Sequence, residues 1–172
     1  PTQHHHSSAA SDVYKRQVAG DVMDHDIQNW FRNNHRLEIG DRTAEQIKIA
    51  VGSAMRSRSK NILVKGRDLV SGIPKTIDVR SDEIRQALKD SVKRILEVVK
   101  DALESTPPEL SSDIIDRGIL VAGGGAQLRG LDQVIREKTN VPCNVVEEPH
   151  LAIVKGCGKI IEDLEKYKHV LI

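Results

Sequence analysis

The stretch "GILVAGGGAQLRG", residues 118–130, decides the fold more than any other part of the sequence. The four apolar residues 119–122 run into three consecutive glycines, Gly123, Gly124 and Gly125, and a helical pattern follows. Glycine weakens any regular element, so three together serve a local need. Either the chain turns very tightly there, or another group comes very close to the backbone. The stretch predicts a buried strand, a glycine loop and a helix in succession.

The bulk composition is that of an ordinary soluble protein, with 38% hydrophobic and 30% charged residues among 172. A chain of this length predicts one domain or two small lobes. The net charge of +1 and the lack of a long basic block argue against nucleic-acid binding. No apolar run approaches the roughly 20 residues that span a bilayer. Cys143 and Cys157 are interpreted as small reduced core residues, which favours a cytoplasmic protein.

Residues 1–17 have no periodicity and contain the run His4–His6, so they predict a non-native or disordered leader and no metal site. The native protein is expected to begin further upstream.

The pattern becomes regular after this leader. Helical spacing of apolar residues, β-favouring runs and turn-forming residues predict the following elements in the first part of the chain. They are a helix over 21–34, a helix over 43–54 with Thr43 as N-cap, strands over 62–65 and 76–79, and one long helix capped by Ser81 that runs through Leu103 to a stop at Pro107.

Strands and helices alternate beyond residue 110. A strand over 119–122, a helix over 130–139, a strand over 143–146 and a helix over 151–166 are expected. This alternation predicts an α/β layer, into which residues 43–104 are inserted as an α+β lobe.

The position of the glycine loop suggests a ligand site. Ligands of open α/β sheets bind at the carboxyl ends of strands, and helix N-termini attract anionic groups, so nucleotide binding is a natural hypothesis. The common motifs do not match: a G-x-G-x-x-G pattern meets Leu128 at its third glycine, and a P-loop lysine after Gly130 is replaced by Leu131. The loop by itself leaves the tight turn and the nucleotide site equally open.

Four longer segments break this tie. Together they resemble the MreB/Mbl family of rod-shape-determining bacterial actin homologues, over about residues 18–164. The segments are "GDRTAEQIKIAVGSA" (40–54), "KGRDLVSGIPKTI" (65–77), "STPPELSSDIIDRGILVAGGGAQLRGLD" (105–132) and "GCGK" (156–159).

The resemblance implies the C-terminal half of an actin-like ATPase with a ribonuclease H-like α/β fold. Residues 18–42 and 105–172 would form its inner α/β lobe, and residues 43–104 its small α+β outer lobe. The residues that the resemblance assigns to the adenosine side of ATP are Glu45, Lys48, Gly123, Gly124, Gly125, Ala126 and Gln127.

Glu45 and Lys48 match an E-x-x-K pair of the family. Their i,i+3 spacing places both on one helix face, from which they could reach ribose and adenine edges. The alternative is an exposed salt bridge between the two, which would contribute about 0.3 kcal/mol.

The resemblance also implies what this chain lacks. Two phosphate loops, a metal-positioning acid and the water-activating residues would lie upstream, so the chain has no candidate catalytic residues. Phosphoryl transfer needs donors around the phosphates and a magnesium ion, so this chain is not expected to hydrolyse ATP by itself. ATP with magnesium is expected in the complete protein.

The complete protein is expected to form filaments of like subunits and to organise wall synthesis with the cell-wall elongation machinery. It would lie in the cytoplasm at the inner face of the membrane, attached through the half that is missing here. Two alternatives are another actin-superfamily ATPase, of the plasmid-segregation or chaperone type, and a small α/β cofactor-binding enzyme. The enzyme would need an acid/base pair near the glycines, whereas Asp113 and Asp116 precede the strand and should lie at its other end.

Two segments depart from the family pattern. Residues 53–66 are more basic than expected of the family, and residues 150–153 replace a usual threonine-cysteine pair. These departures bear on filament and ligand contacts and leave the fold prediction unchanged.

Overall fold

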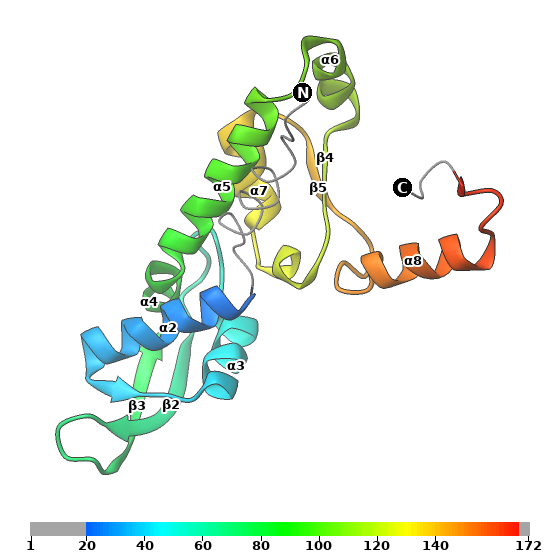
Figure 1. Ribbon diagram of the computed structural model, residues 1–172. Helices are drawn as coiled ribbons and strands as arrows, with labels where there is room; N and C mark the ends of the chain where they lie inside the picture. Colours follow the sequence, from blue (N-terminus) through cyan, green and yellow to red (C-terminus); the bar gives the residue numbers. More distant parts are fainter. Residues whose placement is uncertain (1–19, 169–172) are drawn as a thin grey trace, which may run out of the picture. The chain divides into compact units, whose positions relative to one another are not determined.

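The computed structural model describes residues 20–168, and the chain divides into two compact units between Thr106 and Pro107. The helices and strands are coloured along the sequence in Figure 1. Each unit is described by itself below. The leader expected over residues 1–17 lies outside the described residues.

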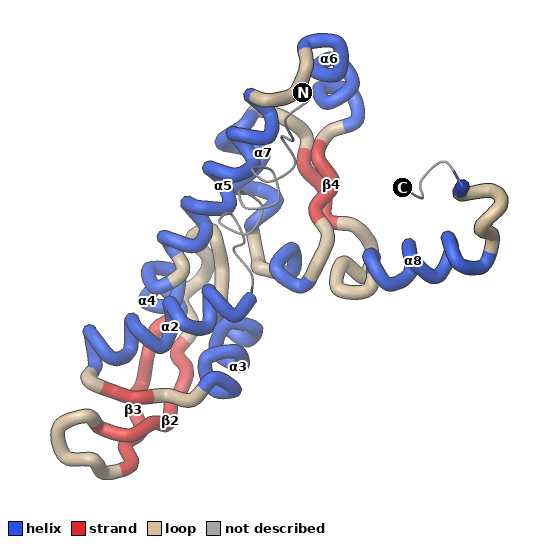
Figure 2. Tube along the Cα trace, viewed as in Figure 1, coloured by secondary structure: helices blue, strands red, loops and turns tan. Residues whose placement is uncertain are grey.

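The first unit combines helices with an antiparallel sheet in the order β1-β2-β3. Figure 2 shows the β2–β3 hairpin, in which Asn61 pairs with Arg80 and Arg67 pairs with Pro74. In chain order its elements are α2 (Gly20–His35), β1 (Leu37–Glu38), α3 (Asp41–Val51), β2 (Asn61–Asp68), β3 (Pro74–Arg80), α4 (Ser81–Ala87) and α5 (Lys89–Glu104).

The core of the first unit lies between one face of this sheet and the helices, and α2 and α3 lie together beside the hairpin (Figure 1). Side chains alternate along a strand, so Val64 is buried while its neighbour Leu63 is 74% exposed on the other face. The sheet is therefore covered on one face and open on the other. The fully buried large side chains of the unit are Met23, Ile27, Phe31, Leu37, Val64, Val79, Ile84 and Leu88.

Helix α3 begins earlier than its sequence predicts. Gly40, with φ −78° and ψ 164°, is the N-cap, and its carbonyl accepts hydrogen bonds from the N–H groups of Thr43 and Ala44, both at 3.0 Å. The prediction of Thr43 as N-cap is wrong, because a glycine in extended conformation already starts the helical hydrogen bonds.

The long helix expected from Ser81 to Leu103 is interrupted. Leu88 has φ −83° and ψ −4°, which is too far from helical ψ to continue the helix smoothly. Its N–H still bonds to the carbonyl of Ile84 at 3.1 Å, so α4 and α5 follow one another closely. Leu88 is fully buried, and the break places this side chain in the core.

Ser81 is the first residue of α4 and not its cap. Its hydroxyl oxygen accepts a hydrogen bond from the N–H of Lys60 at 3.0 Å, and Arg80 takes the N-cap position. The carboxylate of Glu83 accepts the N–H of Arg80 at 3.0 Å. The serine therefore joins the helix start to the segment before β2.

The second unit contains a parallel pair of strands. Ile119 pairs with Cys143 and Val121 with Val145, and α7 makes the crossover that a parallel pair requires. Its elements are α6 (Pro108–Arg117), β4 (Ile119–Val121), the 3₁₀ helix η1 (Gly124–Gln127), α7 (Leu131–Thr139), β5 (Cys143–Val145) and α8 (Ala152–Glu162). Its buried hydrophobic residues are Ala126, Leu128, Leu131, Ile135 and Cys143.

These elements confirm the expected alternation of strands and helices after residue 110. Helix α6 was not expected, because Pro107 and Pro108 were interpreted only as a stop. Pro108 instead occupies the first turn of α6, where the missing N–H of proline has no intrahelical partner to lose.

None of the helices within residues 20–168 is long and apolar enough to cross a bilayer. Helix α2 packs against α3, α4 and α5 within the first unit. The grouping of residues 18–42 with residues 105–172 in one inner lobe stays a prediction, because the two units are described separately.

Candidate functional site

The glycine loop follows β4 directly. Gly123 has φ +89°, a left-handed conformation that side chains rarely adopt, and its N–H donates to the carbonyl of Pro149 at 2.7 Å. The tight-turn interpretation therefore accounts for the first glycine of the three.

The turn does not account for Gly124 and Gly125. Neither has a positive φ, and a Cβ added to either would meet no atom of residues 20–168 within 4 Å. Both begin η1, in which the N–H of Leu128 bonds to the carbonyl of Gly125 at 3.1 Å. Both positions could therefore carry a side chain, yet the sequence has glycine at both.

The other two predicted loop residues differ in exposure. Ala126 is 4% exposed and contributes its methyl group to the core, so only its backbone could contact a ligand. Gln127 is exposed, and its side-chain nitrogen lies 3.1 Å from Nδ1 of His150. His150, which the sequence did not single out as a site residue, is itself exposed. No sequence motif predicted that His150 would lie beside the glycine loop.

The segment that carries His150 also carries an ion pair. Lys155 at the start of α8 binds the carboxylate of Glu148, and this hydrogen bond lowers the pKa of Glu148. Glu148 therefore stays ionised, and the ion pair ties α8 to the segment that holds Gly123 through Pro149.

Lys48, in the first unit, is held by α2. Its Nζ lies 2.7 Å from Oδ2 of Asp24 and donates to the carbonyl oxygen of Gly20 at 3.1 Å. The side chains are 17% exposed for Lys48 and 12% for Asp24. A lysine ammonium has three N–H donors, so these two partners leave one donor for another group.

Glu45 is exposed on α3. Within residues 20–168, no hydrogen bond or ion pair joins it to Lys48. The expected alternative, a surface salt bridge between the two, is wrong, since Lys48 pairs with Asp24 instead. Asp24 lies 24 residues earlier in the chain, and no spacing rule pointed to it.

The second carboxylate oxygen of Asp24 is unusual. Oδ1 is buried and accepts no hydrogen bond within the described residues. An unpaired buried acceptor costs free energy, so the ion pair to Oδ2 must offset this cost as well as hold α2 to α3.

The predicted site residues thus form two groups. Gly123 to Gln127 form one in the second unit, and Glu45 and Lys48 lie on one helix of the first. That the two groups face one nucleotide stays a prediction, because the units are described separately.

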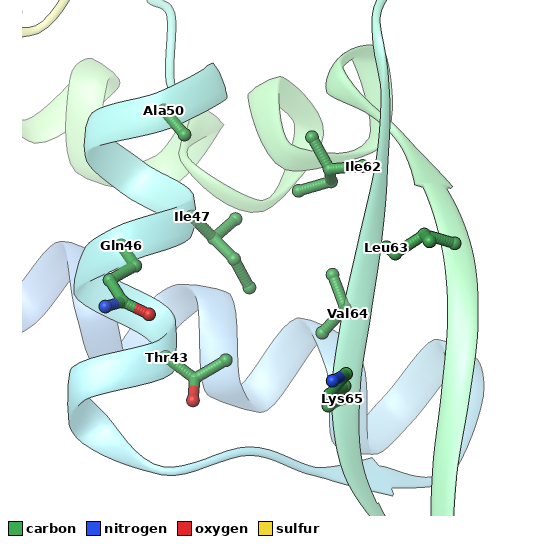
Figure 3. Close-up of a pocket in the computed structure, with 8 residues that line it drawn as sticks. All are labelled: Thr43, Gln46, Ile47, Ala50, Ile62, Leu63, Val64 and Lys65. Carbon is green, nitrogen blue, oxygen red and sulfur yellow. The ribbon is translucent and has the colours of Figure 1, made fainter.

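A hollow of about 330 Å³ lies between α3 and β2 (Figure 3). Ile47 and Val64 point into it, whereas Leu63 points away. Neither Glu45 nor Lys48 lines it, and its mostly aliphatic wall does not suit a nucleotide. The lining residues are Thr43, Gln46, Ile47, Ala50, Ile62, Leu63, Val64 and Lys65.

The two cysteines differ. Cys143 is buried in β5, and this burial raises the pKa of its thiol, which keeps it protonated and unreactive. Cys157 is exposed on α8, so the prediction that it is a core residue is wrong. Among residues 20–168, no group of three or more His, Cys, Asp or Glu side chains is arranged to hold a metal ion.

The sequence matches the family described as "MreB/Mbl protein" over residues 8–169. It is 46% identical over 151 residues to the cell shape-determining protein Mbl of Bacillus subtilis (strain 168), a match that covers 87% of this chain and 45% of Mbl. The chain therefore spans about half the length of this relative.

Solved structures that are similar to this one include the following two. The crystal structure of MreB5 of Spiroplasma citri bound to ADP has a TM-score of 0.83 at 33% identity, covering 88% of this chain and 46% of that one. MreB5 has also been solved with AMPPNP. The MamK double helical filament has a TM-score of 0.70 at 23% identity, covering 84% of this chain and 44% of that one, which shows a shared fold.

Proposed function

Because the chain belongs to the MreB/Mbl family and has part of the actin-like fold, we propose that it forms one half of a filament-forming, nucleotide-binding protein. This half receives the adenosine side of ATP. The family membership also argues against the two alternatives, a plasmid-segregation or chaperone ATPase and a small cofactor-binding enzyme.

The observation that carries the proposal is the open space around Gly124 and Gly125. Neither glycine is needed for backbone conformation, and a Cβ at either would meet nothing within 4 Å in the described residues. Two glycines that the fold itself does not require are consistent with a ligand that lies against the backbone there. The N–H groups at the start of η1 provide donors for such a ligand.

The proposed contacts from the first unit are complementary to ribose and adenine. Lys48 has one N–H donor beyond those given to Asp24 and Gly20. Glu45 offers an exposed carboxylate that accepts hydrogen bonds from hydroxyl or amino groups. Two solved structures of MreB5 hold ADP and AMPPNP, which supports a nucleotide as the ligand.

Hydrolysis, wall synthesis and membrane association belong to this proposal at the level of the complete protein. ATP and magnesium would be bound jointly with the phosphate loops that the family resemblance assigns to the other half of the protein. The complete protein would self-associate at the inner face of the membrane and guide the wall-elongation machinery.

The test uses a chimera in which residues 20–168 replace the matching part of Bacillus subtilis Mbl, with the 172-residue chain measured in parallel. Gly124→Val fills the space beside the backbone without a clash in the protein. ADP affinity, measured by titration calorimetry, should fall at least about tenfold if bound nucleotide occupies this space.

Gly156→Val is the matched control, because Gly156 also lacks a positive φ, and a Cβ there would meet no other part of the described chain within 4 Å. This variant should bind ADP as the parent chimera does. Equal affinity of Gly124→Val and the parent would show that the loop is only a turn.

A further inference from the structure

The connection from α3 to β2 is strongly basic. Residues 53–67 contain five Lys or Arg residues and no Asp or Glu. Arg67 is paired with Glu38, but within the described residues Arg56, Arg58, Lys60 and Lys65 make no ion pair. All four are exposed. We name residues Arg56, Arg58 and Lys60 the basic segment.

The basic segment leads into β2, and its last residue is held to the start of α4. The carbonyl of Lys60 accepts the N–H of Ser81 at 2.8 Å, and the N–H of Lys60 donates to the hydroxyl of Ser81 at 3.0 Å. The three cations are thus gathered within five residues of one exposed connection.

A complementary surface lies on α6. Glu109, Asp113 and Asp116 follow one another at i, i+4 and i+7, which places them on one face of the helix over about 10 Å. All three are exposed, and within residues 20–168 none of them makes an ion pair. Helix α6 buries no residue, so this acidic face is open to solvent.

Large apolar side chains are also exposed near each group of charges, although the helical spacing places those of α6 beside the acidic face and not on it. Leu63 is 74% exposed on the open face of the sheet, and Lys65, two residues further along β2, lies on the same face. On α6, Leu110 is 52% and Ile115 is 65% exposed. Charged residues around exposed apolar ones are typical of protein–protein interfaces.

We propose that the basic segment of one molecule binds the acidic face of α6 in a second copy of this chain. The number, exposure and opposite sign of the charges carry the inference. The two surfaces are different parts of the chain, so each molecule can offer one to a neighbour on either side and the contact can repeat head to tail. The inference rests on the proposed self-association and names the residues that mediate it.

A zero-length carbodiimide cross-linker tests the contact, because it joins a carboxylate directly to a lysine amine. An equal mixture of ¹⁵N-labelled and unlabelled 172-residue protein is cross-linked, and peptides that pair the two isotopes are intermolecular. Links from Lys60 or Lys65 to Glu109, Asp113 or Asp116 are expected. Intermolecular links that all lie elsewhere would overturn the proposal.

Charge reversal supplies the quantitative test. Arg56→Glu/Arg58→Glu should lower the association constant about tenfold in sedimentation equilibrium at low salt, as should Asp113→Arg/Asp116→Arg. Combining all four changes in one chain should restore association. Lys89→Glu/Arg94→Glu on α5 is the matched control, with the same change in net charge on exposed residues outside the basic segment. An equal loss in this control would overturn the proposal.

The remaining outcomes separate this inference from the function on which it rests. Undiminished association of Arg56→Glu/Arg58→Glu would refute this contact and leave filament formation standing. A wild-type chain that stays monomeric while Mbl chimeras assemble independently of these charges would do the same. Binding of the basic segment to phosphatidylglycerol vesicles, without any self-association, would replace the second copy by an anionic lipid surface and refute the proposal. Circular dichroism confirms that each variant is folded.

Discussion

Lys48 and Asp24 form a partly buried ion pair, with Nζ 2.7 Å from Oδ2, that joins α3 to the first turns of α2. The lysine that the family resemblance assigns to the nucleotide therefore also supports the fold. Removing it would change stability and ligand contacts together, so the two roles must be tested through different residues.

The structural role is tested at Asp24. Asp24→Asn keeps the shape of the side chain but leaves the half-buried ammonium of Lys48 without a charged partner. We expect the free energy of unfolding in urea to fall by about 2 kcal/mol. A change below about 0.5 kcal/mol would show that the ion pair contributes little.

The ligand role is tested at Glu45. This side chain is exposed, so Glu45→Ala should change the free energy of unfolding by less than about 0.5 kcal/mol. In the Mbl chimera the same substitution should weaken ADP binding about fivefold, the value of one lost hydrogen bond. Unchanged ADP affinity in calorimetry would remove Glu45 from the site.

The sheet of the first unit depends on close backbone approach at Gly66. A Cβ there would lie 2.5 Å from the carbonyl oxygen of Glu38 and 2.8 Å from Cγ of Leu37. Gly66→Ala should therefore separate β1 from β2 and lower the free energy of unfolding by about 2 kcal/mol or more. Gly40→Ala, where a Cβ meets nothing within 4 Å of described atoms, should cost less than about 1 kcal/mol. Similar losses at both positions would contradict this account.

The loop of the β2–β3 hairpin should make stability depend on acid. Asp68 accepts the N–H groups of Ser71 at 3.0 Å and Val70 at 2.9 Å, and it pairs with Lys75 at 3.1 Å. The hydrogen bond from Ser71, followed by those from Lys75 and Val70, lowers the pKa of Asp68 well below its ordinary value. A lowered folded pKa contributes stability above the unfolded pKa, and this contribution disappears as the pH falls towards the folded pKa.

We expect the wild type to have a higher free energy of unfolding than Asp68→Asn. This difference should be greatest near about pH 6 and should decrease below about pH 4. Urea unfolding across this range measures it. A difference that stays constant with pH would mean that the ionised carboxylate is not what stabilises the loop.

The sequence predicted the elements that have long apolar periodicity. Four residues of α2 were expected to pack in the core. Met23, Ile27 and Phe31 are buried, whereas Trp30 is only partly buried. The strands around 62–65 and 76–79 form the hairpin. Predictions of helix caps were wrong where a typical capping residue makes a different hydrogen bond in the folded chain. A serine before a helix suggested a cap at Ser81, but its hydroxyl bonds to Lys60, and only the folded chain brings the two together.

The candidate site was predictable for a different reason. Gly124 and Gly125 stand out because the sequence repeats a residue that weakens regular structure, and that signal is local. Asp24 and His150 gave no such signal, since each gains its partner from a segment more than 20 residues away. Interactions between distant segments depend on tertiary structure, which residue spacing does not encode.

Helix α8 has a consequence for handling this protein. It is an eleven-residue helix that buries no side chain, and Ile153, Val154 and Ile161 are each about two-thirds exposed or more. Helices this short are marginal in water without a packed face. Its amide hydrogens should exchange with deuterium far sooner than those of α2, and an added surface that slows this exchange would identify its neighbour.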